Sequence, residues 1–343
     1  MKSNIFFAAL MCCLSLVFAT EASANSWRVN PDQRAGADFL DFNAAMADER
    51  VVDGDILYMD KGSTIATQQT ISKKVTIVGP GYFIGENDAD EAYLSNVVNL
   101  TANGIKITGL HTSSLILAAS DIVIERCRVT GNIVANSSDA TNCSIRSSII
   151  VGGQATGGAA FGWEIVNNIF YKNVNDTNYA SCPIYSFSNA LIDHNIIIYY
   201  NSWGAYSINE ITNSTITNNI ILNSSSSYGI ANNSLSSNNI ISHNVLNTSG
   251  YSDYPNNKYN TTISFVGTPG TNQRDEYYQL PEDSPAKGYA EDGSDCGPFA
   301  GAYPYVLCGY PLYVPRFESI TVPSQPNEEG KLIINMKIVN QNQ

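Results

Sequence analysis

Residues 192–198 read Ile192-Asp193-His194-Asn195-Ile196-Ile197-Ile198, and much of the chain repeats this pattern. Related tetrapeptides begin at Ile107, Ile124, Ile145, Ile165, Ile192, Ile216 and Ile241. The intervals between them are 17, 21, 20, 27, 24 and 25 residues. Short runs rich in β-branched residues and bounded by Asn, Ser and Gly predict strands joined by tight turns. A repeat of this length without helical periodicity predicts a β-solenoid, whose coils must stack to bury their apolar faces.

One asparagine recurs at the fourth place of four successive copies. These residues are Asn168, Asn195, Asn219 and Asn244. Stacked coils would place equivalent side chains about 4.8 Å apart, so the amides can hydrogen-bond in a ladder. Asparagine also tolerates the left-handed backbone that a sharp turn requires. We therefore assign these residues a structural role.

Composition limits the classes of partner. The 343 residues are 43% hydrophobic and 14% charged, which favours a folded chain over a disordered one. There are 18 Lys and Arg against 31 Asp and Glu, a net charge of −13. Such a balance excludes nucleic acid as the expected partner, because the sequence supplies no basic surface that would neutralise the phosphates.

The N-terminus predicts export. Lys2 precedes the apolar run 5–19, and Ala22-Ser23-Ala24 supplies a small-residue cleavage pattern. The mature chain is expected to begin at Asn25 and to lie in the periplasm, at the cell surface or outside the cell. No later segment is long and apolar enough for a membrane span.

Two regions outside the repeat resemble a known family. Residues 37–84 carry Asp53-Gly-Asp-Ile-Leu-Tyr58 and Lys74-Val-Thr-Ile-Val-Gly-Pro-Gly-Tyr82, and the tail carries Asp292-Gly-Ser-Asp-Cys-Gly-Pro-Phe299. These segments resemble right-handed parallel β-helix proteins of the pectate-lyase-like superfamily, over most of residues 37–310. The resemblance implies an all-β solenoid with an N-terminal capping helix, expected over residues 39–46. It implies less about activity, because this fold carries several chemistries.

The repeat and the resemblance together divide the chain. Residues 1–24 are predicted to be a signal peptide, 25–60 an N-terminal cap and 61–250 the parallel β-helix. Residues 251–315 are rich in Tyr, Pro and Gly and are expected to form a C-terminal cap. Two alternating runs within 316–343 predict a β-hairpin extension.

Lyases of this superfamily use an Arg or Lys base, and the sequence offers few. Between Lys172 and Lys258 there is no basic residue, although the coils are most regular there. Arg146 is the weak candidate, and its repeat position favours an ion pair with Glu125 on the preceding coil instead.

Hydrolases of the superfamily need clustered carboxylates. The Asn-Thr-Asp, Asp-Asp, Gly-His-Gly and Arg-Ile-Lys motifs that carry them are absent from the sequence. Glu164 and Asp193 are the best remaining pair, on adjacent coils at a separation of roughly 8 Å, within the range for an inverting glycosidase. Ordinary solvated acids would give the same pattern.

Metal and cofactor sites have little support. His194 and His243 share a repeat position two coils apart, about 10 Å, which is too far for one metal. These two and His111 are expected at turns or on the surface. The acidic stretch 86–90 allows calcium but lacks the spacing of a calcium loop. No cofactor or metal is therefore expected.

An aromatic cluster is the best candidate for a binding site. Tyr199, Tyr200, Trp203 and Tyr206 fall within eight residues at a coil corner. Sugar rings stack on exposed aromatic faces while polar neighbours bond their hydroxyls, so a polysaccharide partner is the hypothesis. Packing of the same rings within the core is the structural alternative.

Five cysteines follow the predicted cleavage site. Cys296 and Cys308 flank a turn-rich stretch and form the expected disulfide, whereas the pairing of Cys127, Cys143 and Cys182 stays open.

Three functions compete. The favoured one is an exported monomer that binds glycans or acts in polysaccharide use without a recognisable catalytic set. An atypical polysaccharide lyase or glycoside hydrolase is the first alternative, and a structural or adhesive surface protein is the second.

Overall fold

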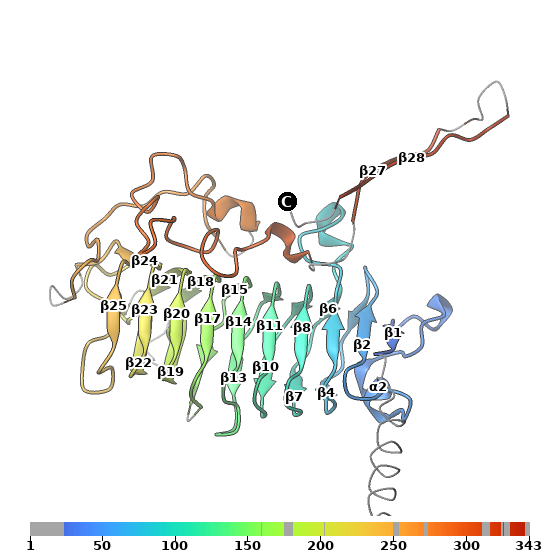
Figure 1. The fold of residues 1–343 in the computed structure, drawn as a ribbon, viewed down its shortest axis with the longest axis horizontal. Coiled ribbons are helices and arrows are strands. Elements are labelled where there is room, and N and C mark those ends of the chain that lie inside the picture. The colour runs from blue at the N-terminus through green and yellow to red at the C-terminus, as the bar shows by residue number, and fades with distance from the viewer. Residues whose placement is uncertain are drawn as a thin grey trace, which may run out of the picture.

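The computed structural model describes residues 24–158, 160–174, 181–201, 203–249, 254–270, 274–310, 316–323, 325 and 330–339. The predicted signal peptide therefore lies almost wholly outside the described residues. Three parallel sheets run along one axis and confirm the expected parallel β-helix, in keeping with the right-handed form (Figure 1). We call them sheets A, B and C, in the order in which the chain enters them in each coil.

Sheet A has ten strands, sheet B nine and sheet C seven. Sheet A contains β1 (Ser26–Val29), β2 (Ile56–Met59), β5 (Thr76–Val78), β8 (Lys106–Thr108), β11 (Val123–Glu125), β14 (Ser144–Arg146), β17 (Glu164–Val166), β20 (Leu191–Asp193), β23 (Thr215–Thr217) and β25 (Ile240–Ser242). Sheet B contains β3 (Thr64–Ile65), β6 (Tyr93–Leu94), β9 (His111–Thr112), β12 (Arg128–Val129), β15 (Ile149–Val151), β18 (Ile169–Val174), β21 (Ile196–Asn201), β24 (Ile220–Asn223) and β26 (Val245–Leu246). Sheet C contains β4 (Gln69–Ile71), β7 (Val98–Leu100), β10 (Leu115–Leu117), β13 (Ile133–Ala135), β16 (Ala155–Thr156), β19 (Ile184–Ser188) and β22 (Ile208–Thr212).

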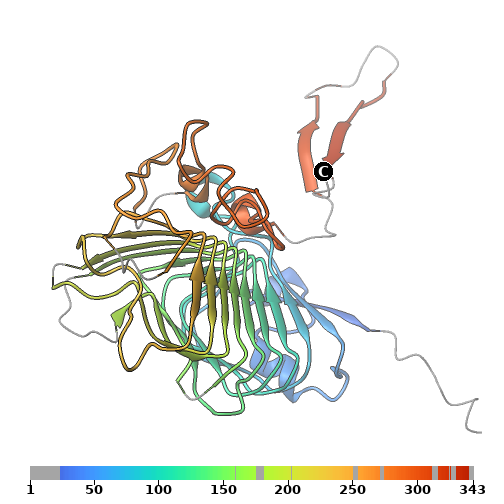
Figure 2. The ribbon, with the colours of Figure 1, turned by 60° about the vertical axis from the view of Figure 1, so that its left-hand side comes forward.

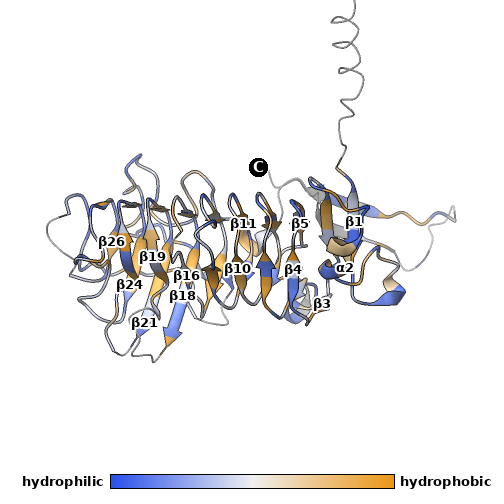
Figure 3. Cartoon of the chain, turned by 90° about the horizontal axis from the view of Figure 1, so that it is seen from below, coloured by the Kyte–Doolittle hydropathy of each residue, from blue (hydrophilic) through white to orange (hydrophobic). Residues whose placement is uncertain are grey.

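The isoleucine that opens each repeat points into the solenoid. Ile165 pairs with Ile192 in register, Ile192 pairs with Ile216, and all three are fully buried. Outward-facing neighbours such as Glu164 and Asp193 flank them, and hydrophobic residues lie along the strands of the coils in Figure 3. Stacking therefore buries one continuous apolar column, which is the main stabilising term of such a fold.

The ladder asparagines are buried and bonded as expected. The Asn195 Oδ1 atom accepts from the Asn168 backbone N at 2.9 Å and from Asn168 Nδ2 at 3.1 Å. Asn195 Nδ2 donates to the Ile165 carbonyl at 2.8 Å and to Asn219 Oδ1 at 2.9 Å. Asn257, which lies outside the repeat, continues the ladder by accepting from Asn244 Nδ2 at 3.0 Å.

The left-handed turn residue is not the ladder asparagine but the residue before it. Positive φ angles occur at the third repeat position in six successive coils. These are Arg126 (51°), Ser147 (46°), Asn167 (58°), His194 (51°), Asn218 (57°) and His243 (56°). We call this line of residues the αL row. Asn and His tolerate this conformation better than most residues, which explains their frequency there.

The capping helix is shorter than expected and begins later. Helix α2 covers Phe42–Ala47, because the Asp41 side chain accepts from Ala44 N at 2.8 Å and caps it. Phe39, expected to open the helix, instead bridges to Val29 of β1. The helix buries Phe42 and Ala45 and packs against β4, so it covers the first end of the apolar column.

Residues 274–310 form a segment that we call the C-terminal strap. The strap runs back along the αL row towards the first coils and carries the 3-10 helices η4 (Asp275–Tyr278) and η5 (Leu307–Gly309) (Figures 1 and 2). It covers the outward face of sheet B, where Ile149, Ile169, Ile196 and Ile220 join a second apolar cluster with Tyr278 and Tyr305. One face of the solenoid is therefore closed by the chain itself.

The remaining elements lie at the edges. The 3-10 helices η1 (Gln33–Ala35) and η2 (Glu86–Asp88) sit in loops of the first coils. Strands β27 (Arg316–Thr321) and β28 (Asn335–Val339) pair antiparallel and form the expected hairpin, which projects away from the solenoid in Figures 1 and 2.

Replacing Asn195 by Ala tests the ladder. The change leaves the Ile165 carbonyl and the Asn168 amide without partners in a dry interior, so we expect a loss of about 3 kcal/mol in the free energy of unfolding. Denaturant unfolding measures it. Asn99→Ala, on the half-buried outer face of sheet C, should cost less than about 0.5 kcal/mol. Equal losses for the two variants would contradict a structural ladder.

The docking of the strap should depend on pH through Asp275. Burial raises the pKa of this carboxyl from 3.8 to about 6, although Cys308 N and the Tyr305 hydroxyl donate to it. The protonated Asp275 carboxyl therefore favours the folded state fully at pH values below 3.8, its pKa in the unfolded chain. As the pH rises through about 6 this stabilisation is lost, and the free energy of unfolding falls by up to about 3 kcal/mol. Asp275→Asn should raise the midpoint of thermal unfolding at pH 8 and leave it nearly unchanged at pH 4.

The exposed Asp283→Asn supplies the control, and its midpoint should match that of the parent protein at both values. If Asp275→Asn lowered the midpoint of thermal unfolding more at pH 8 than at pH 4, the proposed destabilisation by ionised Asp275 would be refuted.

Candidate functional site

The two predicted acids lie on neighbouring strands of sheet A but have separate partners. Glu164 is level with Leu191, and Asp193 is level with Val166, so the carboxylates are diagonal neighbours. Glu164 Oε2 accepts from Arg146 Nη2 at 2.8 Å, whereas Asp193 Oδ2 lies 2.7 Å from His194 Nδ1. Glu164 is thus held in an ion pair and Asp193 in a different network.

The expected ion pair between Arg146 and Glu125 is wrong. The two residues are level in the sheet, yet Glu125 pairs with Lys106 at 2.8 Å and Arg146 pairs with Glu164. Positive and negative side chains alternate over four successive coils, in the order Lys106, Glu125, Arg146 and Glu164. The observed pairs give each of them a partner, whereas a pair between the middle two would leave the outer two unpaired. Arg146 also stacks on Tyr303 of the strap, 4.3 Å from the ring centre.

The structure separates the four aromatic candidates. Tyr199 is fully buried beside Cys182 and Ala205, and its hydroxyl accepts from Asn201 Nδ2 at 2.6 Å, so it is not a binding residue. Tyr200 points to the other side and packs edge-on against Tyr171, next to the apolar cluster beneath the strap. Alternation along β21 causes this split, because successive side chains leave a strand on opposite faces.

Trp203 is exposed and Tyr206 is partly exposed in the loop after β21, near a third ring, Tyr228, that the sequence did not single out. Trp203 is 62% exposed, and Tyr206 meets Tyr228 edge to face at 5.1 Å between ring centres. A side chain at Gly204 would lie within 2.8 Å of the Tyr228 ring, so that ring packs on the Gly204 backbone. We call Trp203, Tyr206 and Tyr228 the aromatic platform. The sequence feature that could have indicated Tyr228 is its position after β24, one coil beyond the loop that carries the other rings.

The expected disulfide between Cys296 and Cys308 is also wrong, and all five described cysteines are free. The Cys296 thiol donates to the His243 carbonyl at 3.2 Å, whereas Gly309, next to Cys308, lies against the Arg126 carbonyl. Five coil spacings of about 4.8 Å separate those two positions, whereas a disulfide needs Cα atoms within about 7 Å. The strap is extended along the solenoid, so the stretch between the cysteines is not a closed turn.

His111 belongs to a buried ion cluster rather than to the surface. Its Nδ1 atom lies 2.6 Å from Glu91 Oε2, and Arg128 donates to Glu91 Oε1 at 3.0 Å. Burial opposes ionisation of Glu91, but the hydrogen bonds from His111 and Phe83 N and the charge of Arg128 outweigh it and lower its pKa. The cluster fixes loop 83–91 to sheet B.

The acidic stretch 86–90 joins this ion cluster. Asp88 faces Arg128 at 3.4 Å, and Asp90 faces Lys61 at 3.2 Å. Both carboxylates therefore have basic partners. Within the described ranges no group of three or more metal-ligating side chains occurs.

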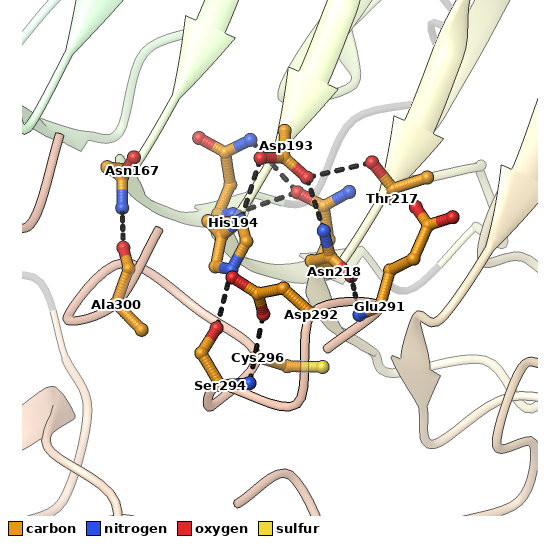
Figure 4. A network of polar contacts seen from close by, with 12 residues as sticks. Asn167, Asp193, His194, Thr217, Asn218, Glu291, Asp292, Ser294, Cys296 and Ala300 are labelled. Atoms are coloured by element: carbon orange, nitrogen blue, oxygen red, sulfur yellow. Dashed lines mark hydrogen bonds and ion pairs between the residues drawn. The ribbon is translucent and has the colours of Figure 1, made fainter. Parts of the chain in front are cut away.

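A polar network lies where the strap crosses the αL row at β20 (Figure 4). Asp193 Oδ1 accepts from Thr217 Oγ1 at 2.7 Å and from Asn218 Nδ2 at 2.8 Å, and its other oxygen meets His194 Nδ1. His194 Nε2 lies 3.5 Å from Ser294 Oγ of the strap. His194 is a turn residue, as expected, and it is only 3% exposed because the strap covers it.

Comparisons with known proteins give only a distant structural match. No family model and no curated protein matches the chain. Five chains among solved structures match, and one is a mutant of the PL6 family alginate lyase AlyGC, at 11% identity and a TM-score of 0.25. The match covers 81% of this chain and 59% of that one. A similarity this low supports no statement about activity. In the described part of the chain, no helix has the length and apolar character of a membrane span.

Free cysteines give a chemical test of the strap path. After unfolding without reductant, iodoacetamide should alkylate Cys127, Cys143, Cys182, Cys296 and Cys308, as read by peptide mass spectrometry. The folded protein should react slowly, because burial raises the pKa of Cys127, Cys182 and Cys296 to about 12. Recovery of a peptide linking Cys296 to Cys308 would contradict the extended path.

Proposed function

We propose that this is an exported protein that binds neutral polysaccharide at the aromatic platform. The observation that carries the proposal is Trp203, a large flat ring that is 62% exposed and directly precedes Gly204, against which Tyr228 of the Tyr206–Tyr228 pair packs. Isolated exposed apolar residues are common, but a tryptophan grouped with two tyrosines supplies the face on which a sugar ring stacks.

Polar groups around the platform support a sugar partner. Residues 224–227 are four serines directly before Tyr228, and Ser224, Ser226 and Ser227 are exposed. Asn201 fixes the turn by accepting from Trp203 N at 2.8 Å. Hydroxyl-rich loops beside an aromatic face match the amphipathic surface of a sugar, with apolar C–H faces and a polar edge.

Charge favours a neutral glycan over a uronate polymer. The sequence between Lys172 and Lys258 has no Lys or Arg, and Lys172 itself is 6% exposed. An acidic polymer would be repelled by a protein of net charge −13, and the sequence between Lys172 and Lys258 supplies no Lys or Arg to bind its carboxylates. Sheet B offers no second surface here, since the strap covers it.

Substitution of Trp203 by Ala tests the proposal. Loss of one stacking ring should weaken retention on an insoluble neutral polysaccharide at least about tenfold, or about 1.4 kcal/mol. A panel of cellulose, xylan, mannan and starch, measured by depletion from solution, provides the readout. Thermal unfolding should be unchanged, because the ring is largely outside the core.

Phe161 gives a matched control, because it is also an exposed ring, at 49%, but belongs to another loop. Phe161→Ala should bind as the parent protein does. No binding by the parent protein to the whole panel, or equal binding by Trp203→Ala, would overturn the proposal and favour the structural or adhesive alternative.

A further inference from the structure

We propose that Ser294, His194 and Asp193 form an acyl-transfer centre that hydrolyses small carboxylic esters. The three side chains are in line: Asp193 Oδ2 is 2.7 Å from His194 Nδ1, and His194 Nε2 is 3.5 Å from Ser294 Oγ (Figure 4). A nucleophile, a base and a group that orients the base are the parts that hydroxyl activation needs.

Asp193 is a positioning residue that orients His194 and is itself held by two hydrogen bonds. Thr217 and Asn218, both on the next coil, donate to its Oδ1 atom and leave Oδ2 for the histidine. Because a carboxylate accepts and does not donate, the His194 proton in this hydrogen bond lies on Nδ1. The Nε2 atom, which faces Ser294, then carries the lone pair of a base.

The imidazole is fixed from two sides. Its backbone has a φ of 51°, which turns the side chain from sheet A towards the strap. Gly301 of the strap lies against the ring, since a side chain there would come within 2.8 Å of His194 Cγ. The His194 side chain is 4% exposed, so its bonds to Asp193 and Ser294 are shielded from water.

Ser294 is more accessible than its base. It is partly exposed, and Glu291, Asp292 and Gly293 before it are exposed. Its backbone N donates to Asp292 Oδ1 at 2.9 Å, which shapes the turn. Hydrogen bonds from the Ser294 hydroxyl and backbone N lower the pKa of Asp292, so the hydroxyl proton is directed at Asp292 in this conformation and must turn to His194 Nε2 before transfer. The 3.5 Å gap to Nε2 is longer than a good hydrogen bond, as is common in ligand-free centres.

Other residues of the αL row hold the strap without a histidine and a carboxylate, so the Asp193–His194–Ser294 arrangement is not required for docking the strap. Asn167 holds it through the Pro298 carbonyl at 2.9 Å, and Ser147 through the Tyr303 carbonyl at 2.6 Å. His243 occupies the αL row too, but Ser242 precedes it, and its Nδ1 atom is buried with no partner in the described structure. Of the two histidines in the αL row, only His194 lies within hydrogen-bond distance of both a carboxylate and a hydroxyl in the described structure.

The chemistry is an ordinary two-step transfer. The Ser294 oxygen attacks the ester carbonyl carbon while His194 Nε2 takes the hydroxyl proton. The C–O bond to the alcohol breaks, and the proton passes to the departing oxygen. Water then attacks the acyl-serine, again with His194 as base, and releases the carboxylic acid and free Ser294. No oxidant, reductant or metal is needed for this balance.

Two readouts test the centre in the full chain. A fluorophosphonate probe should label the protein at Ser294, located by peptide mass spectrometry, and the protein should hydrolyse p-nitrophenyl acetate. Ser294→Ala should abolish the label and lower kcat/KM at least about 100-fold. His194→Asn should do the same and still fold, because Asn occupies this turn position on the neighbouring coils.

Further variants separate chemistry from folding. Asp193→Asn should lower kcat and leave KM unchanged, because Asp193 does not touch the substrate. The exposed Ser138→Ala should keep parental activity. No probe label at Ser294, or equal hydrolysis by Ser294→Ala, would overturn the proposal. Trp203→Ala should keep ester hydrolysis and Ser294→Ala should keep polysaccharide retention, so failure of one proposal is distinguishable from failure of the other.

Discussion

The rest of the structure depends on a two-residue turn between sheets A and B. The first residue takes a left-handed backbone, and the second turns its side chain into the interior, where Asn168, Asn195, Asn219 and Asn244 bond from coil to coil. Each amide satisfies buried backbone groups of the preceding coil and bonds to the side-chain amide of the next, which an apolar residue cannot do. This constraint keeps successive strands in register and aligns the apolar column beneath them.

The same turn creates an edge on the outside of the solenoid. The left-handed backbone directs Arg126, Ser147, Asn167 and Asn218 outward from the solenoid, where the strap covers them and hydrogen-bonds to them. The strap then covers the outer isoleucines of sheet B. Two features follow: sheet B is closed to ligands, and side chains from residues a hundred positions apart, such as His194 and Ser294, come together.

The two functional proposals rest on different parts of the coil. The aromatic platform depends on loops that leave sheet B after β21 and β24, where strand pairing ends and large side chains are partly or largely exposed. The acyl-transfer centre depends on the αL row and the strap. The proposed glycan binding and the proposed ester cleavage would therefore be separable in this fold, and neither proposal uses the carboxylate pair of a glycosidase.

The sequence by itself determined the solenoid, the inward isoleucines and the asparagine ladder, because each follows from a local pattern repeated at strand spacing. It also indicated Tyr199, Tyr200, Trp203 and Tyr206 as candidate binding rings, without separating the buried from the exposed ones. It did not determine the partner of Glu125, the burial of Tyr199, the state of Cys296 and Cys308, or the meeting of Asp193, His194 and Ser294. The partner of Glu125 depends on which neighbouring coil its side chain contacts, and the burial of Tyr199 depends on the face of β21 that it occupies. The state of the two cysteines and the meeting of Asp193, His194 and Ser294 depend on the path of the strap, which has no repeat and whose course is set by long-range contacts along the αL row. Local periodicity specifies how coils stack, whereas only the tertiary structure decides what lies on their outer face.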